Sequence, residues 1–329
     1  MAMSKITYRE ALTRALEEEL RNYERVFVLG TDLHDPQGGS FKVETGLTHK
    51  FGKQRIFNTP ISEIAIAGSA LGAAMTGMRP IAEIMYMDFF GCAMDQIMNQ
   101  IAKLRYMSGG QIEAPLVLIT QQGTGRSSAA QHSQSLEAIF SHIPGLKVVM
   151  PATPHDAIGL LKTAVRDNDP VIFIEHKMLY NEKGEVPDEE FFVPFGKAAI
   201  RREGADVTVV ATLKMVGRAM EAAAILEAEG IDVEVIDPRT IVPLDEESIL
   251  RSVSKTHRLV VVHEAVKRCG WGGEICGLIM EKSFYDLDAP VVRVAGKNIP
   301  IPFSARLENE ATPKVSDIVE AVRATVGGN

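Results

Sequence analysis

The alternation of short apolar runs with helical segments constrains the fold of this chain more than any other feature. The first half contains several β-branched or apolar runs, each too short to form a helix of its own, and helical segments of roughly a dozen residues lie between them. Strands that alternate with helices predict a parallel sheet covered by helices on both faces, the α/β class. The predicted strands are Val26–Leu29, Ile81–Met85, Pro115–Thr120, Leu146–Met150 and Pro170–Glu175.

A second α/β pattern begins after a break in this alternation. The stretch Tyr180–Gly196 is charged, contains two prolines and shows no sustained period, which is typical of a linker between domains. Beyond it, strands and helices alternate again, with Val207–Ala211 as a strand and Arg218–Glu229 as a helix. A chain of 329 residues also suits two domains. We predict one domain over residues 1–185, a linker over 186–200, and a smaller domain over 201–329.

Composition and charge exclude several classes of protein. The net charge of -8 argues against a nucleic-acid binder, because phosphate contacts need a basic surface. Cys92, Cys269 and Cys276 form no C-x-x-C pair, and so few cysteines fit a reducing cytoplasm. Residues 1–10 contain no apolar run like that of a secretory signal. The weakly polar stretch 64–78 is short and rich in Ala and Gly, which predicts a packed helix and not a membrane span.

Glu63 is the first candidate for a functional residue. It follows Thr59-Pro60-Ile61-Ser62 and lies in the first turn of a predicted helix that continues to Ala74. Most glutamates in a first turn only complement the helix dipole. The helix after Glu63 is unusually rich in small residues, including Gly68 and Gly72, which would let a flat ligand or another backbone come close.

His132 and Phe89 are the other candidates. His132 lies in a polar, glycine-containing loop, Gln122–Gln134, that follows a predicted strand. Parallel sheets bind ligands at the carboxyl ends of their strands, and histidine transfers protons near neutral pH. Phe89 also follows a strand, where its ring could stack on a planar ligand or fill the core. The helix predicted from Cys92 to Met107 ends at Gly109-Gly110.

Several segments together resemble the beta subunits of pyruvate, branched-chain 2-oxo-acid and acetoin dehydrogenases, which depend on thiamine diphosphate. The resemblance covers nearly the whole chain, and the order and spacing of the segments are intact. The segments are TPISE (59–63), AMDQIMNQIAKLRYMSGG (93–110), AAQHSQ (129–134), HIPGLKVV (142–149) and AVRDNDPVIF (164–173). This resemblance implies a pyrimidine-binding, transketolase-like domain with a parallel sheet, followed by a smaller transketolase C-terminal-type α/β domain.

The resemblance also implies roles for the three candidates. Glu63 matches the glutamate that hydrogen-bonds the aminopyrimidine ring of thiamine diphosphate and promotes its imino tautomer. Phe89 matches the aromatic position beside that ring. His132 matches the loop histidine that faces the substrate and the incoming lipoyl group. Glu63 and His132 are therefore expected to be catalytic, and Glu63 and Phe89 to bind the cofactor, which is the electron sink.

The partners follow from the same resemblance. Enzymes that bind the diphosphate within one chain carry a Gly-Asp-Gly motif, and this sequence has none. An alpha subunit is therefore expected to supply the magnesium and diphosphate contacts in an alpha-2-beta-2 heterotetramer. The expected assembly is cytoplasmic, binds neither nucleic acid nor membrane, and passes acyl groups to a lipoyl domain of a dihydrolipoyl acyltransferase core.

Some members of the family also bind potassium near the segment that matches RDNDP (166–170). The matching ligands here would be the backbone carbonyls of Leu116, Ala164 and Val165, with Asp167 and Asp169. Such an ion would brace the sheet and take no part in the chemistry.

The substrate and one alternative enzyme class stay open. The segments HIPGLKVVMP (142–151) and IEHKMLY (174–180) are most similar to acetoin-type and bacterial pyruvate-type subunits, whereas QQGTGRSS (121–128) departs from both patterns. Acetoin, pyruvate and branched-chain 2-oxo acids therefore all remain possible substrates. The alternative is the C-terminal subunit of a split transketolase, which would transfer ketol units between sugars. A non-catalytic assembly subunit is a third reading, and retention of Glu63 and His132 argues against it.

Overall fold

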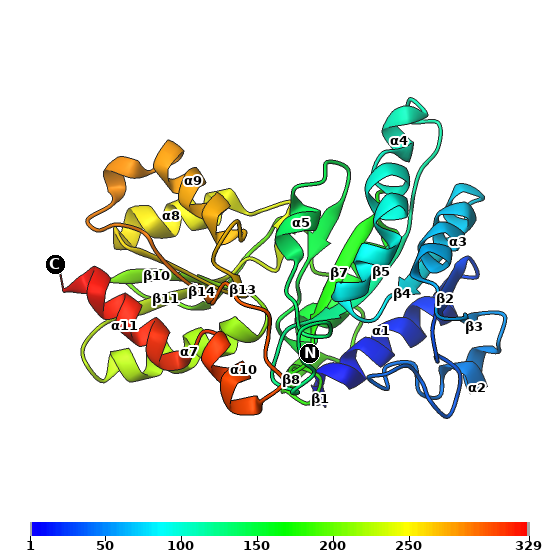
Figure 1. The fold of residues 1–329 in the computed structure, drawn as a ribbon, viewed down its shortest axis with the longest axis horizontal. Coiled ribbons are helices and arrows are strands. Elements are labelled where there is room, and N and C mark those ends of the chain that lie inside the picture. Colours follow the sequence, from blue (N-terminus) through cyan, green and yellow to red (C-terminus); the bar gives the residue numbers. More distant parts are fainter. Residues whose placement is uncertain (1, 328–329) are drawn as a thin grey trace. The chain divides into compact units, whose positions relative to one another are not determined.

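The computed structural model describes residues 2–327 and forms two compact units (Figure 1). Unit 1 comprises the chain up to Gln122 together with Ile139–Phe195, and unit 2 comprises Gly123–Ala138 together with the chain from Gly196 onward. A short segment from the first half of the sequence thus belongs to the second unit. The domain limits of 1–185 and 201–329 stay a prediction.

Unit 1 is built on a parallel sheet with the strand order β6-β7-β5-β4-β2-β3. Its central strand β5 is buried along its whole length, and Val117 pairs with Ile81 of β4 on one side and Val171 of β7 on the other. This confirms the predicted parallel sheet. The strands are β2 (Val26–Gly30), β3 (Ile56–Asn58), β4 (Arg79–Glu83), β5 (Val117–Gln122), β6 (Lys147–Val149) and β7 (Val171–His176).

Two helices of unit 1, α1 and α6, begin at residues that cap their free N–H groups. Thr7 and Glu10 form a reciprocal capping box at the start of α1: the Thr7 N–H donates to the Glu10 carboxylate at 2.7 Å, and the Glu10 N–H donates to the Thr7 hydroxyl at 3.2 Å. Thr153 caps α6, with Pro154 in the first turn. α1 and α6 pack against each other. The helices are α1 (Tyr8–Asn22), α2 (Leu47–Phe51), α3 (Glu63–Met75), α4 (Leu104–Met107), α5 (Glu137–Ser141) and α6 (Pro154–Arg166), and an antiparallel ribbon joins β1 (Met3–Thr7) to β8 (Lys183–Pro187).

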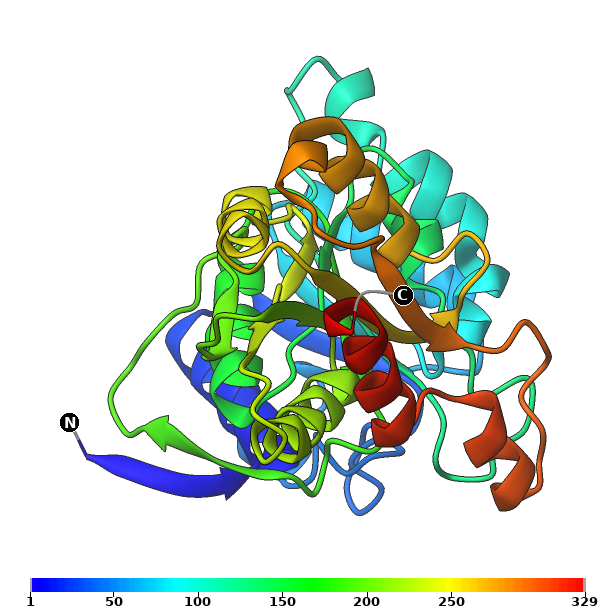
Figure 2. The same cartoon turned by 90° about the vertical axis from the view of Figure 1, so that its left-hand side faces the viewer.

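Unit 2 is a smaller sheet with the order β14-β13-β10-β11-β9, in which only β9 is antiparallel. α7 and α11 pack together on one face of this sheet, and α8 and α9 cover the opposite face (Figures 1 and 2). The strands are β9 (Ala199–Arg202), β10 (Val207–Ala211), β11 (Val233–Asp237), β12 (Thr240–Val242), β13 (Leu259–Val266) and β14 (Val292–Gly296). The helices are α7 (Lys214–Glu227), α8 (Glu246–Thr256), α9 (Gly272–Lys282), η3 (Phe284–Asp286), α10 (Ala305–Ala311) and α11 (Val315–Val326).

The single helix predicted over residues 92–107 is wrong in one respect. The chain there forms a 3-10 helix, η1 (Met87–Ala93), then a π-helix, η2 (Gln96–Ile101), then α4. The buried residues Ala93, Ile97 and Ile101 recur every four positions, a spacing that an α-helix also has, so the sequence pattern does not distinguish the π turn from a regular helix. η2 packs against α3, and Gly68 of α3 leaves room for the Gln96 side chain.

Three observations apply to the described residues 2–327. No helix in this range is both long and apolar enough to cross a bilayer. The three cysteines of the chain lie in this range and are free thiols. Within the same range, no group of three or more His, Cys, Asp or Glu side chains is placed to hold a metal ion.

Candidate active site

Glu63 is the first residue of α3, just after the carboxyl end of β3. The Thr59 N–H donates to the Gly30 carbonyl at 2.8 Å, which fixes the connection between β3 and α3 to the end of β2. Ser62 is the N-cap residue, and its side chain makes no capping hydrogen bond. The Glu63 side chain is partly exposed and has no hydrogen bond or ion pair with any residue in the described range 2–327. Its carboxylate is therefore open to a ligand at the sheet edge where parallel α/β sheets bind ligands.

Phe89 lies on η1, which follows β4. The Phe89 N–H donates to the Tyr86 carbonyl at 2.8 Å and closes the first turn of this 3-10 helix. η1 packs against α3, so the structure brings together the elements that carry Phe89 and Glu63. The Phe89 ring is half-buried, with part of its surface still accessible. The two residues predicted to bind one cofactor ring thus lie on neighbouring elements of unit 1.

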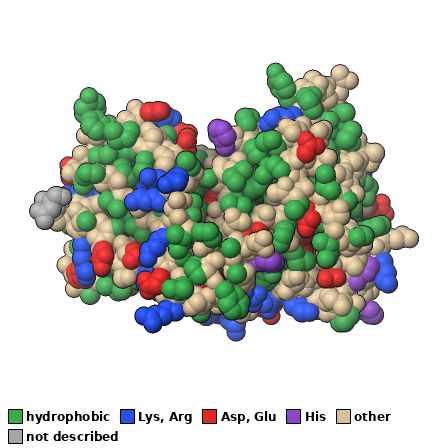
Figure 3. Space-filling view, in the orientation of Figure 1, with side chains coloured by type: hydrophobic (Ala, Val, Ile, Leu, Met, Phe, Trp, Pro, Cys, Tyr) green, Lys and Arg blue, Asp and Glu red, His purple; other side chains and the backbone are tan. Residues whose placement is uncertain are grey.

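One face of α3 is exposed and formed by small or apolar residues. At Gly72, an added Cβ atom would meet no other atom within 4 Å. Among the larger side chains near this face, Ile61 is 80% exposed, which is unusual for an isoleucine. Figure 3 shows hydrophobic side chains at the surface of the part of unit 1 that carries α3 and α4. The exposed residues at helical spacing are Ile61, Ile64, Ala65, Ser69, Gly72 and Met75.

A cluster of three buried glutamates lies in unit 1. Glu83 ends β4 and Glu175 lies in β7, on either side of Gln121 in β5. The Gln121 side-chain amide donates to Glu83 Oε1 at 2.9 Å and to Glu175 Oε2 at 3.5 Å, and the Tyr180 hydroxyl donates to the same Glu175 oxygen. Glu44, in the loop before α2, completes the cluster by electrostatic coupling to Glu83. This cluster was not predicted from the sequence, although an acidic residue within an apolar strand can be recognised there.

Burial shifts the titration of this cluster toward neutral pH, so its carboxyl groups stay protonated in mildly acidic solution. Burial raises the pKa of Glu83 to about 7 and that of Glu175 to about 8, and burial with the charge of Glu83 raises the pKa of Glu44 well above its usual range. Glu44 Oε2, Glu83 Oε2 and Gln121 Oε1 accept no hydrogen bond from the described residues. Protons on the carboxyl groups supply donors to a region that is rich in acceptors.

We expect Glu83→Gln to change stability in a pH-dependent way. A carboxyl group with a raised folded pKa adds stability that is complete below its ordinary pKa of 4.5 and is lost as pH rises through about 7. Glutamine stays neutral and can accept the same bond from Gln121. The free energy of unfolding should therefore be nearly unchanged at about pH 5 and raised by about 3 kcal/mol at most above about pH 8.

Urea denaturation of the chain across this pH range measures the effect. Glu185→Gln is the matched control, because Glu185 is exposed on β8 of the same unit. Profiles for the wild-type and Glu83→Gln proteins that run parallel at every pH would contradict the buried, protonated cluster.

His132 lies in unit 2, in the segment Gly123–Ala138 that follows β5. Its N–H donates to the Ala129 carbonyl at 3.5 Å, and its side chain is half-buried. Ser127 and Ala129 adopt positive φ angles of 51° and 59°, a conformation that costs energy for residues other than glycine. The loop that carries His132 is thus held in a defined and unusual conformation, and Glu63 and Phe89 belong to the other unit.

A cavity of about 470 Å³ lies beside His132 within unit 2. Its walls are the loop residues on either side of His132, the end of β13 and the segment after β14. Leu136, Val266 and Ile299 contribute apolar surface, and the Ser133 hydroxyl, which is buried, accepts or donates no hydrogen bond within the described residues. The lining also includes the polar residues Gln131, Gln134 and Asn298, so the cavity offers both apolar and polar surface to a ligand.

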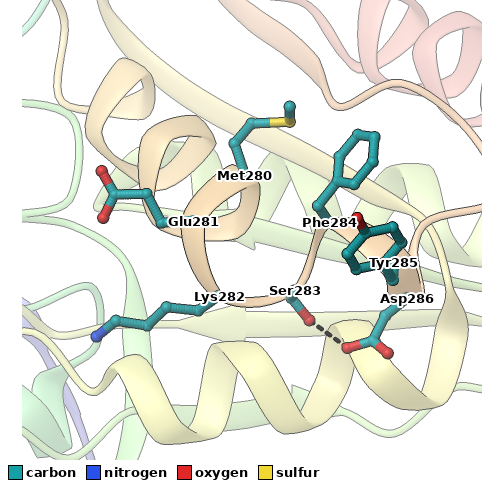
Figure 4. Close-up of a pocket in the computed structure, with 7 residues that line it drawn as sticks. All are labelled: Met280, Glu281, Lys282, Ser283, Phe284, Tyr285 and Asp286. Atoms are coloured by element: carbon teal, nitrogen blue, oxygen red, sulfur yellow. Dashed lines mark hydrogen bonds between the residues drawn. The ribbon is translucent and has the colours of Figure 1, made fainter.

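A second hollow, of about 400 Å³, lies at the end of α9 and along η3 (Figure 4). Its side chains are engaged with one another or with neighbours. The Ser283 and Ser254 hydroxyls donate to the Asp286 carboxylate, and Lys282 pairs with Glu246. We find no group there that is poised for acid–base chemistry.

Arginine and lysine side chains of the chain itself bind several of the predicted potassium ligands. Arg79 donates to the carbonyls of Val165 and Asp167 at 2.8 and 3.0 Å, and Lys147 binds both Asp167 oxygens at 2.6 Å. Asp169 pairs with Arg105 and Lys147. The carbonyls of Leu116 and Ala164 accept backbone N–H groups from Val171 and Asp167. Several of these oxygens are thus engaged within the chain, and the potassium site stays a prediction.

If Lys147 and Arg79 take the place of an ion here, exchange of potassium for sodium at equal ionic strength should leave the melting temperature unchanged. An ion bound at a hundred times its Kd would add about 2.7 kcal/mol of stability. Thermal denaturation in the two salts measures this effect. A rise in melting temperature of several degrees that is specific to potassium would support the predicted potassium site.

The comparisons with known proteins agree with this geometry. The model of the transketolase pyrimidine binding domain matches residues 4–183, and that of the transketolase C-terminal domain matches residues 196–318. The pyruvate dehydrogenase E1 component subunit beta of Rhizobium meliloti (strain 1021) is 50% identical over 323 residues, which is 98% of this chain and 70% of that protein. The chain belongs to the E1 beta-subunit family.

Two further known proteins match nearly the whole chain. The acetoin:2,6-dichlorophenolindophenol oxidoreductase subunit beta of Bacillus subtilis (strain 168) is 45% identical over 333 residues, covering 98% of this chain and 97% of that one. A solved split-gene transketolase, described as an inactive beta4 tetramer, superimposes with a TM-score of 0.81 at 26% identity, covering 98% and 99% of the two chains. The predicted fold class and enzyme family are confirmed, and the split-transketolase alternative has less support than the dehydrogenase subunits.

Proposed function

We propose that this chain is the beta subunit of the decarboxylating component of a pyruvate- or acetoin-type dehydrogenase and that it works with thiamine diphosphate. The observation that carries the proposal is the Glu63 carboxylate, which is open at the start of α3 in a chain of the E1 beta family. Glu63 would hold a ring nitrogen of the aminopyrimidine, and Phe89 would cover a face of that ring. The cofactor, when bound, supplies the electron sink for cleavage next to the substrate carbonyl.

His132 would serve the acyl-transfer half of the reaction. An imidazole can donate a hydrogen bond or pass a proton to a reacting sulfur atom, which suits reduction and acylation of a lipoyl disulfide. The cavity is lined by loop residues that flank His132, and Leu136 and Ile299 give it apolar surface for part of a lipoyl arm. This supports a lipoyl domain of a dihydrolipoyl acyltransferase core as the acceptor.

An alpha subunit would complete the site. The relatives that match along nearly their full length are named as beta subunits, which implies such a partner. We propose an alpha-2-beta-2 heterotetramer, in the cytoplasm, in which the alpha subunit holds magnesium and the diphosphate. The exposed small-residue face of α3 beside Glu63 is the surface we assign to contact with a partner chain.

A reconstituted enzyme tests this function. The chain and its genomic-neighbour alpha subunit should reduce an artificial electron acceptor with pyruvate or acetoin as substrate. His132→Ala should lower lipoyl-dependent turnover by about 10²-fold or more and lower turnover with the artificial acceptor less. Equal losses in the two assays would remove the lipoyl-facing role, and transfer of ketol units between sugars in place of both activities would favour the split transketolase.

A further inference from the structure

Glu308 binds the backbone of the loop that carries His132. It lies on α10 and is only 3% exposed. Its Oε1 accepts the Gly125 N–H at 2.9 Å, and its Oε2 accepts the Ser127 N–H at 3.0 Å. One buried carboxylate therefore holds two N–H groups on either side of Arg126, at a sequence separation of about 180 residues.

Glu264 binds the same loop at Thr124, just before the two residues that Glu308 binds. It lies on β13, and its Oε1 accepts both the Thr124 N–H at 2.6 Å and the Thr124 hydroxyl at 2.8 Å. Two carboxylates from the second half of the chain thus bind three backbone N–H groups between Thr124 and Ser127. Hydrogen bonds from backbone N–H groups to a carboxylate are among the strong ones in proteins.

These bonds fall where the loop backbone is strained. Ser127, whose N–H binds Glu308, has a φ angle of 51°, and Ala129 has a φ angle of 59°. Residues other than glycine keep such angles only where surrounding contacts enforce them. The Glu308 contact lies directly at the first of these positions, five residues before His132. Loss of that contact would let the segment that carries His132 relax.

We infer that Glu308, with Glu264, is a positioning residue that fixes the His132 loop for acyl transfer. This inference rests on the proposed function only for its last step, since the anchoring itself is independent of any cofactor. Glu308 touches no reacting group and acts through the loop backbone. A displacement of about 1 Å at a reacting group can lower a rate about 100-fold, so a positioning residue can matter for turnover.

The first test measures directly how firmly the His132 loop is held. Arg126 is exposed and lies between the two N–H groups that Glu308 binds, so trypsin cleavage at the Arg126–Ser127 bond reports release of the loop. Glu308→Gln keeps one good acceptor and Glu308→Ala keeps none, so the cleavage rate and the amide exchange of residues 123–136 should rise in that order. Glu310→Gln is the matched control, because Glu310 lies on the same helix and is exposed.

The second test measures turnover in the reconstituted enzyme. Glu308→Gln should lower lipoyl-dependent turnover about 10- to 100-fold and leave turnover with an artificial acceptor less affected. Unchanged cleavage and exchange in both Glu308 variants would overturn the anchoring. Faster cleavage with equal losses in the two activity assays would overturn the positioning role. A failure of the proposed function itself would appear separately, as full turnover in a Glu63→Gln enzyme whose loop is unaltered.

Discussion

Replacement of Glu63 by glutamine is expected to lower turnover of the reconstituted enzyme by about 10² to 10⁴-fold, the usual loss when an acid–base group is removed. Glu63 opens α3, and its carboxylate has no partner among the described residues, so glutamine can take its place without breaking any contact within the chain. The amide cannot exchange a proton with a ring nitrogen of the cofactor. Steady-state kinetics with the artificial acceptor measure the loss, and size-exclusion chromatography should show an intact assembly.

The control for this variant is Glu274→Gln. Glu274 is also an acidic residue in the first turn of a helix, α9, and it is exposed. If Glu63 only complements a helix dipole, the two variants should behave alike, each with a stability loss of about 0.3–1 kcal/mol and full activity. Near-normal turnover in Glu63→Gln would remove Glu63 from the mechanism.

Gly72→Leu is expected to weaken assembly with the partner subunit while the chain itself stays folded. An added Cβ at Gly72 meets no atom within 4 Å, and leucine favours a helix over glycine by about 0.8 kcal/mol, so the isolated chain should be at least as stable as the wild type. If the exposed face of α3 packs against a partner subunit, the larger side chain overfills that interface. Overpacking typically costs about 1–3 kcal/mol, which weakens association about 10- to 100-fold.

Gly217→Leu is the matched control for this prediction. Gly217 lies in α7 of unit 2, is exposed, and likewise has no atom within 4 Å of an added Cβ. Thermal denaturation and sedimentation velocity with the alpha subunit separate the two effects. Normal assembly of Gly72→Leu would mean that the face of α3 is free surface in the complex and that the partner binds elsewhere.

Much of the fold could be predicted, because the local periodicity of apolar residues indicates many of the strands and helices. The strand Val207–Ala211 was predicted with the bounds it has, and the helix that begins beside Glu63 starts within one residue of its predicted position. Buried parallel strands are continuous apolar runs, which can be read from a short window. The β1–β8 ribbon was missed, because it pairs Met3 with Pro187 and its strands show no apolar alternation.

The features of the site that were missed depend on contacts distant in sequence. Gly123–Ala138 joins unit 2 because Glu264 and Glu308 bind its backbone, and nothing near the loop in sequence indicates those partners. The π turn in η2, which packs against α3, has no counterpart in the apolar periodicity of residues 92–107. The structure also shows Lys147 and Arg79 bound to some of the oxygens predicted to hold potassium, and that site stays a prediction.

Binding of thiamine diphosphate, measured by calorimetry on this chain alone and then with its genomic-neighbour alpha subunit, tests the central claim most directly. The contacts proposed for Glu63 and Phe89 are to the pyrimidine ring only, and the sequence contains no Gly-Asp-Gly motif for the magnesium diphosphate. We therefore expect no detectable binding by the chain alone and micromolar binding in the presence of the partner and magnesium. Tight, magnesium-dependent binding by this chain alone would contradict the account, because it would place a complete cofactor site within one subunit.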